Sequence, residues 1–148
     1  NKTRLEKHYL AVVHGKWPRR KQHVDAPLVK NTLKSGERVS SVSSEGKSAL
    51  TRISVLEQSA DFSLLAMQPV TGRTHQLRVH CQHTGYPIVG DEKYGYEEQD
   101  AQLKRLGVRR LMLHASRLVI PATEPGEKTI RVEAPAGNSF QKMTEMIK

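Results

Sequence analysis

The segment from Pro69 to Tyr94 gathers most of the side chains in this sequence that could do chemistry. Guanidinium and imidazole groups bind anions, and imidazole can also transfer protons because it titrates near neutral pH. Glycines 72 and 85 bracket the group and predict a helix over residues 72–83, since glycine commonly follows a helix end. Arginines near the helix start favour a phosphate or a protein carboxylate, although a basic helix with a solvated face has the same composition. The group consists of Arg73, His75, Gln76, Arg78, His80 and His83.

Other chemistries find less support in this segment. Its histidines and Cys81 match neither a paired CxxC scheme nor HExxH, and adjacent helical residues such as His80 and Cys81 cannot both face one ion. Cys81 shares a stripe with Leu77 and is expected to behave as a small buried hydrophobe rather than a nucleophile. Neither GxxxxGK[ST] nor GxGxxG occurs in the sequence, so we expect no metal and no nucleotide cofactor.

The charge balance favours a polyanionic partner. The 148 residues include 24 Lys and Arg against 15 Asp and Glu, a net charge of +9, and residues 1–40 alone hold ten against three. Basic surfaces bind nucleic acid through phosphate contacts and the release of counterions. A basic soluble protein without such a partner would have the same composition.

A basic loop over residues 14–21 (HGKWPRRK) carries one aromatic side chain. Pro18 bars a regular strand interior here. Trp17 could stack on a base or sugar while the surrounding cations hold phosphates, and a solvated loop is the alternative. The expected phosphate-binding residues are Lys16, Arg19, Arg20 and Lys21.

Length and cysteine content suggest a single cytoplasmic domain. The chain can bury a core, although only 36% of its residues are hydrophobic and 5% aromatic. One cysteine excludes an internal disulfide and fits a reducing compartment. The sequence has no apolar run of about 18 residues and no signal-peptide pattern, so we expect no membrane span and no export. We expect a monomer.

Hydrophobic periodicity predicts an α+β fold with a mixed, mainly antiparallel sheet and flanking helices. Residues 1–7 are compatible with the end of a helix, and Asn138 is expected to cap a terminal helix over residues 139–148. A further helix is predicted over 97–106, and GDEKYG after residue 89 is predicted to be a turn that gives structural support. The predicted strands cover residues 9–13, 28–33, 38–42, 47–57, 62–67, 109–120 and 129–133, with 47–57 and 62–67 forming a hairpin.

GRTHQLRVH followed by GYPIVGDEKYG resembles the third motif region of ribosomal-RNA pseudouridine synthases that act on the large subunit. Three more blocks resemble this family in the expected order: His8–Trp17, Ala26–Glu57 and Arg109–Ile120. The resemblance implies that residues 1–148 form the C-terminal portion of a pseudouridine synthase catalytic domain. It also implies isomerisation of specific uridines in large-subunit ribosomal RNA: uracil is detached from C1′, rotated and rejoined through C5, without metal or cofactor.

The resemblance also assigns roles to individual residues. Tyr9, in the second motif KHYLAVVHG, is expected to stack on the target base and to take part in proton removal from C5. Arg78, the second arginine of GRTHQLR, is expected to pair with and orient a nucleophilic aspartate. Leu113 is expected to press on the base opposite Tyr9, which requires the uridine to be flipped out of its stack. Arg73, His75 and Gln76 are expected to contact RNA.

One family motif is absent from this sequence. The family's first motif, His-Arg-Leu-Asp followed by Thr-Ser-Gly, carries the nucleophilic aspartate and is expected upstream of Asn1. The aspartates at 25, 61, 91 and 100 lack these surroundings, and no spacing in the sequence supplies a partner for Asp91. We therefore expect the 148 residues alone to be inactive. A non-catalytic RNA-binding or ribosome-associated module is the alternative.

Overall fold

The computed structural model describes residues 5–147. Glu6 and Lys7 already belong to the first strand, so the helix end predicted over residues 1–7 is wrong at these positions, and Asn1–Arg4 lie outside the described residues. No helix among residues 5–147 is long and apolar enough to cross a membrane. The elements are β1 (Glu6–His14), β2 (His23–Asp25), β3 (Leu28–Thr32), β4 (Arg38–Val42), β5 (Leu50–Gln58), β6 (Phe62–Pro69), α1 (Gln76–Thr84), α2 (Glu97–Arg105), β7 (Leu113–Ile120), β8 (Ile130–Glu133) and α3 (Asn138–Ile147).

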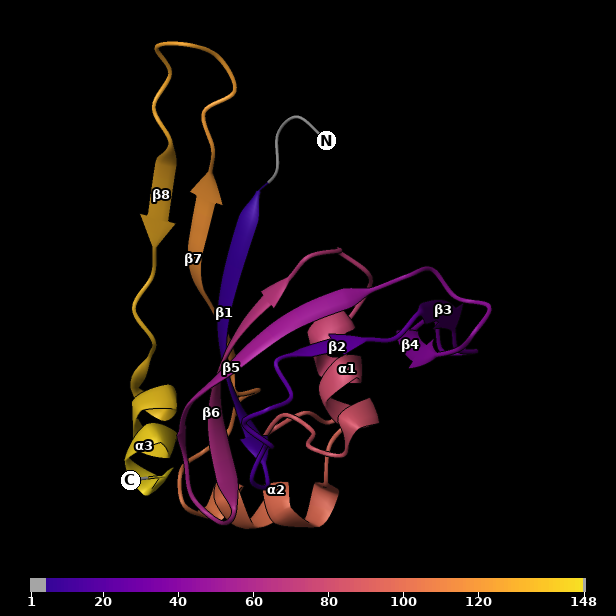
Figure 1. Cartoon of the computed structure of the whole chain (residues 1–148). Coiled ribbons are helices and arrows are strands. Elements are labelled where there is room, and N and C mark those ends of the chain that lie inside the picture. Colours follow the sequence, from indigo (N-terminus) through magenta and orange to yellow (C-terminus); the bar gives the residue numbers. More distant parts are fainter. Residues whose placement is uncertain (1–4, 148) are drawn as a thin grey trace.

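Six strands form the main sheet in the order β2-β5-β6-β1-β7-β8, and β3 pairs with β4 in a separate hairpin (Figure 1). Every ladder among the described strands is antiparallel. The predicted α+β class with a mainly antiparallel sheet is therefore confirmed, as is the hairpin now seen as β5 and β6. β1 lies in the interior of the sheet, where Ala11, Val12 and Val13 are each 0% exposed.

Helices α1 and α3 cover opposite faces of this sheet (Figure 1). Tyr9 and Met67 are paired across β1 and β6, and Met67 contacts Cys81 of α1 with 4.0 Å between the sulfurs. The next residue of β1, Leu10, is paired with His114, whose ring lies 6.1 Å from that of Phe140 in α3. Because successive strand residues point to opposite faces, Tyr9 lies on the face covered by α1.

Helix α1 begins at Gln76, four residues later than predicted. His75, just before it, has a left-handed backbone (φ 53°) and is the only non-glycine residue in the described chain with a positive φ. Because a helical residue needs a negative φ, the helix cannot extend back through residues 72–75. Gly85 ends the helix in the left-handed conformation, as predicted (φ 99°).

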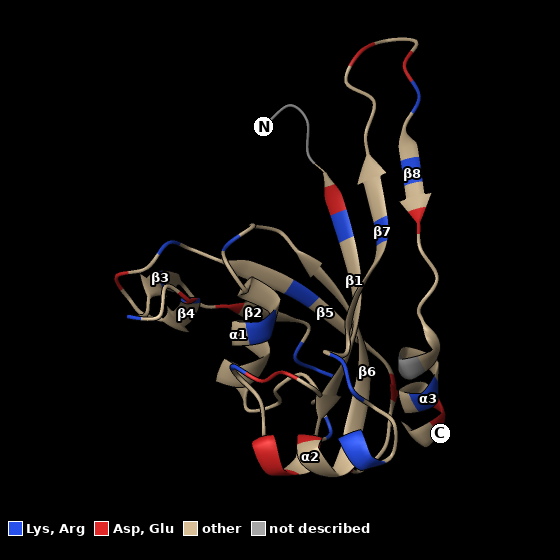
Figure 2. Ribbon diagram, turned by 180° about the vertical axis from the view of Figure 1, so that it is seen from behind, with Lys and Arg blue, Asp and Glu red and all other residues tan. Residues whose placement is uncertain are grey.

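Among the C-terminal elements, α2 and β8 match their predicted ranges within one residue. α3 already includes Asn138, which was predicted to precede the helix as its cap, and Lys148 lies outside the described residues. β7 begins at Leu113 rather than at Arg109, because the N–H of the preceding Met112 donates to the Val89 carbonyl while its own carbonyl accepts from the Val12 N–H. In α2 the acidic first turn and basic last turn complement the helix dipole, as Figure 2 shows in red and blue. The apolar stripe of α3 is buried: Phe140, Met143 and Ile147 are 1%, 0% and 4% exposed.

Candidate active site

Tyr9 and Leu113 share the face of the sheet that α1 covers. Tyr9 lies opposite Ala115, and Ala11 lies opposite Leu113. Directly opposed residues of an antiparallel pair point to the same face, so Tyr9 and Leu113 are diagonal neighbours there, a spacing that aromatic and long side chains can bridge. Both side chains are partly exposed.

Arg78 forms a two-pronged ion pair with Asp91. Its Nε donates to Oδ2 at 2.9 Å, and its Nη2 donates to Oδ1 at 2.7 Å. The Asp91 side chain is fully buried and that of Arg78 is 18% exposed. The hydrogen bond to Asp91 raises the pKa of Arg78 above its already high value, so the guanidinium keeps its positive charge. The expectation that Asp91 lacks a partner is therefore wrong.

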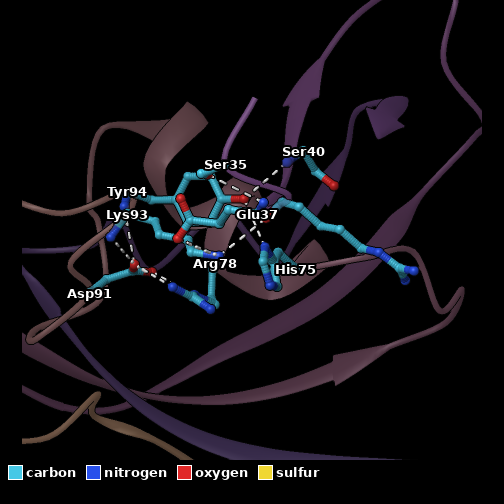
Figure 3. A network of polar contacts seen from close by, with 9 residues as sticks. Ser35, Glu37, Ser40, His75, Arg78, Asp91, Lys93 and Tyr94 are labelled. Carbon is cyan, nitrogen blue, oxygen red and sulfur yellow. Dashed lines mark hydrogen bonds and ion pairs between the residues drawn. The ribbon is translucent and has the colours of Figure 1, made fainter. Parts of the chain in front are cut away.

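Asp91 also holds the turn that follows it. Its Oδ1 accepts the backbone N–H groups of Lys93 at 3.1 Å and Tyr94 at 3.0 Å. Tyr94 in turn lies against Arg78, with the guanidinium carbon 5.1 Å from the ring centroid, a cation–π distance. The Tyr94 hydroxyl accepts the backbone N–H of Ser40 in β4 at 2.9 Å (Figure 3).

His75 is tied to the same turn. Its Nδ1 lies 2.8 Å from the Tyr94 hydroxyl, as drawn in Figure 3. Burial, then the charges of Arg78 and Lys93, lower the pKa of His75, so its imidazole is neutral at pH 7. Since the hydroxyl already accepts from Ser40, we assign its proton to Nδ1 of His75, which places the imidazole proton on Nε2.

Gln76 belongs to a buried hydrogen-bond chain, and burial leaves it no surface for RNA. Its Oε1 accepts from Thr71 and from the Arg73 N–H, while its Nε2 donates to the Leu50 carbonyl and to Thr51. It is 4% exposed, so the prediction that Gln76 contacts RNA is corrected.

The same chain continues from Thr51 to His80, which is 0% exposed. The Thr51 hydroxyl and His80 Nδ1 are 2.8 Å apart, and His80 Nε2 lies 2.9 Å from the Ala26 carbonyl. Burial lowers the pKa of His80, which fits a neutral ring that donates from Nε2 and accepts at Nδ1. His80 thus links α1 to the sheet.

Trp17 lies in the core rather than on the basic loop's surface. It is 1% exposed, its indole N–H donates to the Lys21 carbonyl at 2.9 Å, and its ring is 5.4 Å from that of Tyr86. The prediction that Trp17 stacks on RNA is therefore corrected. The four cations of the loop, Lys16, Arg19, Arg20 and Lys21, are exposed, which both phosphate binding and a solvated loop require.

The loop lies at one end of β1 and Tyr9 near the other. Gly15 donates its N–H to Asp61 in the β5–β6 turn, and Arg19 bonds Gln58 of that hairpin at 3.0 Å. His14 lies five positions after Tyr9 in the strand, a span of roughly 17 Å. Tyr9 and Arg78 also line different surface hollows, and Leu111 lines the same hollow as Arg78. Arg73 lines a third hollow with Lys30 and Lys47.

Comparisons with known proteins agree with this architecture. The family model described as RNA pseudouridylate synthase matches residues 1–83. Ribosomal large subunit pseudouridine synthase C of Yersinia pestis is 47% identical over 93% of this chain, and that of Escherichia coli (strain K12) is 44% identical over 97%. The chain covers 42% and 46% of those proteins, less than half of their length.

Two solved structures share the fold. Human RNA pseudouridylate synthase domain containing 1 matches with a TM-score of 0.69 at 31% identity, over 90% of this chain and 55% of that one. Human RNA pseudouridylate synthase domain containing 4 matches with a TM-score of 0.70 at 27% identity, over 95% and 61%. The resemblance noted in the sequence therefore holds across the chain, which belongs to the RNA pseudouridylate synthase family.

Proposed function

We propose that this chain is part of an enzyme that isomerises specific uridines to pseudouridine in large-subunit ribosomal RNA. The observation that carries the proposal is the family membership, together with Tyr9 and Leu113 as diagonal neighbours on the sheet face that α1 covers. A flipped uracil would stack on Tyr9 and be pressed from its other side by Leu113. No cofactor is needed, and we infer a monomer that works in the cytoplasm.

Arg78 would orient the nucleophile. The Nε and Nη2 atoms of Arg78 both donate to Asp91, while Nη1 of Arg78 has no hydrogen-bond partner among residues 5–147. An aspartate from the part of the catalytic domain that this chain does not include would bond there, and would either attack the sugar or act through an elimination intermediate. Tyr9 would assist removal of the C5 proton after the base is rejoined.

The exposed cations of the basic loop and the half-buried Arg73 would hold the RNA backbone. Lys16, Arg19, Arg20 and Lys21 are suited to phosphates at one end of the sheet, and Arg73 to phosphates near the start of α1. His75 would offer its Nε2–H to the RNA from a fixed, neutral ring.

The isolated 148 residues would be inactive, because they lack the family motif that carries the nucleophilic aspartate, and two of their own four aspartates are already engaged. Asp91 is paired with Arg78, and Asp100 is paired with His14 at 2.8 Å. Formation of pseudouridine by the 148-residue chain alone would contradict this part of the proposal.

The test is Arg78→Ala in the longer protein that contains this chain, with tritium release from RNA labelled at uridine C5 as the assay. We expect turnover to be lost while RNA affinity stays within about threefold, since one transition-state contact typically contributes about 10²–10³ in rate. Retained turnover would overturn the role of Arg78. Lack of product from the unaltered protein on every large-subunit transcript would overturn the function.

A non-catalytic RNA-binding module is the second candidate, favoured by the net charge of +9 and the exposed basic loop. Replacing Lys16, Arg19, Arg20 and Lys21 by glutamine should then weaken binding of any RNA. It should also lower the salt slope of log K by up to about 0.9 for each lost phosphate contact. Such a module would form no pseudouridine in any version.

A further inference from the structure

We infer that Asp91 is a positioning residue for Arg78 in the proposed reaction. Tyr94 is the second residue that holds Arg78 in place. This inference rests on the proposed function, because positioning matters to catalysis only if Arg78 meets the nucleophile. It assigns a task to the Gly90–Tyr94 turn, which follows α1 and lies beside the guanidinium (Figure 3).

The hydrogen bonds of Asp91 fix the orientation of the Arg78 side chain. Its two carboxylate oxygens accept two N–H groups of Arg78 at 2.9 and 2.7 Å, which fixes the plane of the guanidinium as well as its position. The carboxylate itself cannot turn, because Oδ1 also accepts the N–H groups of Lys93 and Tyr94. The Asp91 side chain is also fully buried.

Tyr94 restrains Arg78 from the side. Its ring lies 5.1 Å from the guanidinium carbon, and its hydroxyl is held by Ser40 of β4 and by His75. The ring therefore cannot move away without breaking contacts to the β3–β4 hairpin and to the start of α1. Asp91 bonds the Nε and Nη2 atoms of Arg78, so Nη1 is the guanidinium nitrogen that does not bond Asp91.

The orientation of Arg78 has a direct kinetic consequence. An unrestrained arginine samples many rotamers, and a displacement of about 1 Å at a catalytic group can cost on the order of 100-fold in rate. Asp91→Asn is the informative change. The amide keeps one oxygen for the two backbone N–H groups, but it turns an NH2 group toward Arg78 in place of the second oxygen.

The experiment compares Asp91→Asn with Asp100→Asn in the longer protein. Asp100 is a matched control because it is also a buried carboxylate held by another side chain, with 2.8 Å between its Oδ1 and His14 Nε2. We expect Asp91→Asn to lower kcat about 30- to 100-fold per folded molecule, with RNA affinity within about threefold. Asp100→Asn should lower thermal stability but change kcat by less than about threefold. Equal kcat losses in the two variants would overturn the inference, because both would then act through stability alone.

A second measurement keeps this inference separate from the proposed function. In a 15N NMR spectrum, the Nε–H signal of Arg78 should be slow to exchange in the unaltered protein, lost in Asp91→Asn and kept in Asp100→Asn. If the unaltered protein forms no pseudouridine, the proposed function fails. The Nε–H signal then still tests whether Asp91 holds Arg78 in place. A signal that survives Asp91→Asn would overturn the inference whatever the activity.

Discussion

The buried ring of His80 predicts a loss of stability on acidification. His80 is 0% exposed, its Nε2–H donates to the Ala26 carbonyl, and its Nδ1 accepts from Thr51. A proton on Nδ1 would oppose the Thr51 hydroxyl and leave a charge in the core, which is why burial lowers the pKa of His80. The unfolded chain, with an ordinary histidine pKa of about 6.5, then binds the proton more readily than the folded chain does.

The sign and size of the effect follow from this difference. Because the unfolded state binds more protons, stability is complete above about pH 6.5 and falls as the pH drops through that value. Between pH 7.5 and 5.5, one histidine that stays neutral in the folded state removes up to about 1.4 kcal/mol from the free energy of unfolding. The loss levels off only below the folded-state pKa.

Urea denaturation of the unaltered protein and of His80→Gln at both pH values measures this contribution. The variant will be less stable at pH 7.5, yet its stability should fall with pH by up to about 1.4 kcal/mol less than that of the unaltered protein. His23→Gln, at an exposed position in β2, is the control and should leave the pH dependence unchanged. Identical pH dependence in the unaltered protein and in His80→Gln would refute the reasoning.

Two further predictions concern stability. Trp17→Ala should destabilise the protein by about 3–5 kcal/mol, the usual range for a buried aromatic residue. RNA affinity, measured at a temperature where the variant is fully folded, should stay unchanged. A weaker affinity under that condition would support RNA stacking by Trp17 after all. Gly90→Ala should prevent stable folding or lower the melting temperature sharply, because the φ of Gly90 is +82° and a Cβ would meet the Arg110 carbonyl oxygen. A Gly90→Ala variant that melts within about 2 °C of the unaltered protein in a calorimetric scan would contradict this.

The strands were the most predictable part of this fold. Residues 9–13 form a continuous apolar run, and the structure buries its last three residues, Ala11–Val13, on both faces. The boundary error before β7 has a physical cause. Met112 is apolar and 0% exposed, as a strand residue would be, yet its backbone bonds to Val89 and Val12 outside the regular ladder. Side-chain periodicity carries no information on such long-range backbone pairing.

The candidate site was less predictable because its contacts depend on tertiary geometry. Asp91 lies 13 residues after Arg78, and only the packing of the Gly90–Tyr94 turn against α1 brings the two side chains together. A Gly-Asp turn followed by Tyr signals a carboxylate that caps backbone N–H groups, but it does not name the charged partner. Likewise, one tryptophan among four cations suits RNA stacking and core packing equally, and the structure selects packing for Trp17.

The pair between Arg78 and Asp91 changes how the proposed nucleophile can be activated. An aspartate beside an isolated arginine is held ionised by the positive charge, which is the physical reason to expect it there. In this structure Asp91 already neutralises Arg78 at 2.7 Å, so an approaching carboxylate meets a pair with no net charge. A donated Nη1–H still lowers the pKa of that carboxylate, but by a hydrogen bond rather than by a full opposing charge. Arg78 would therefore act mainly by fixing direction, and its precision would depend on Asp91 and Tyr94.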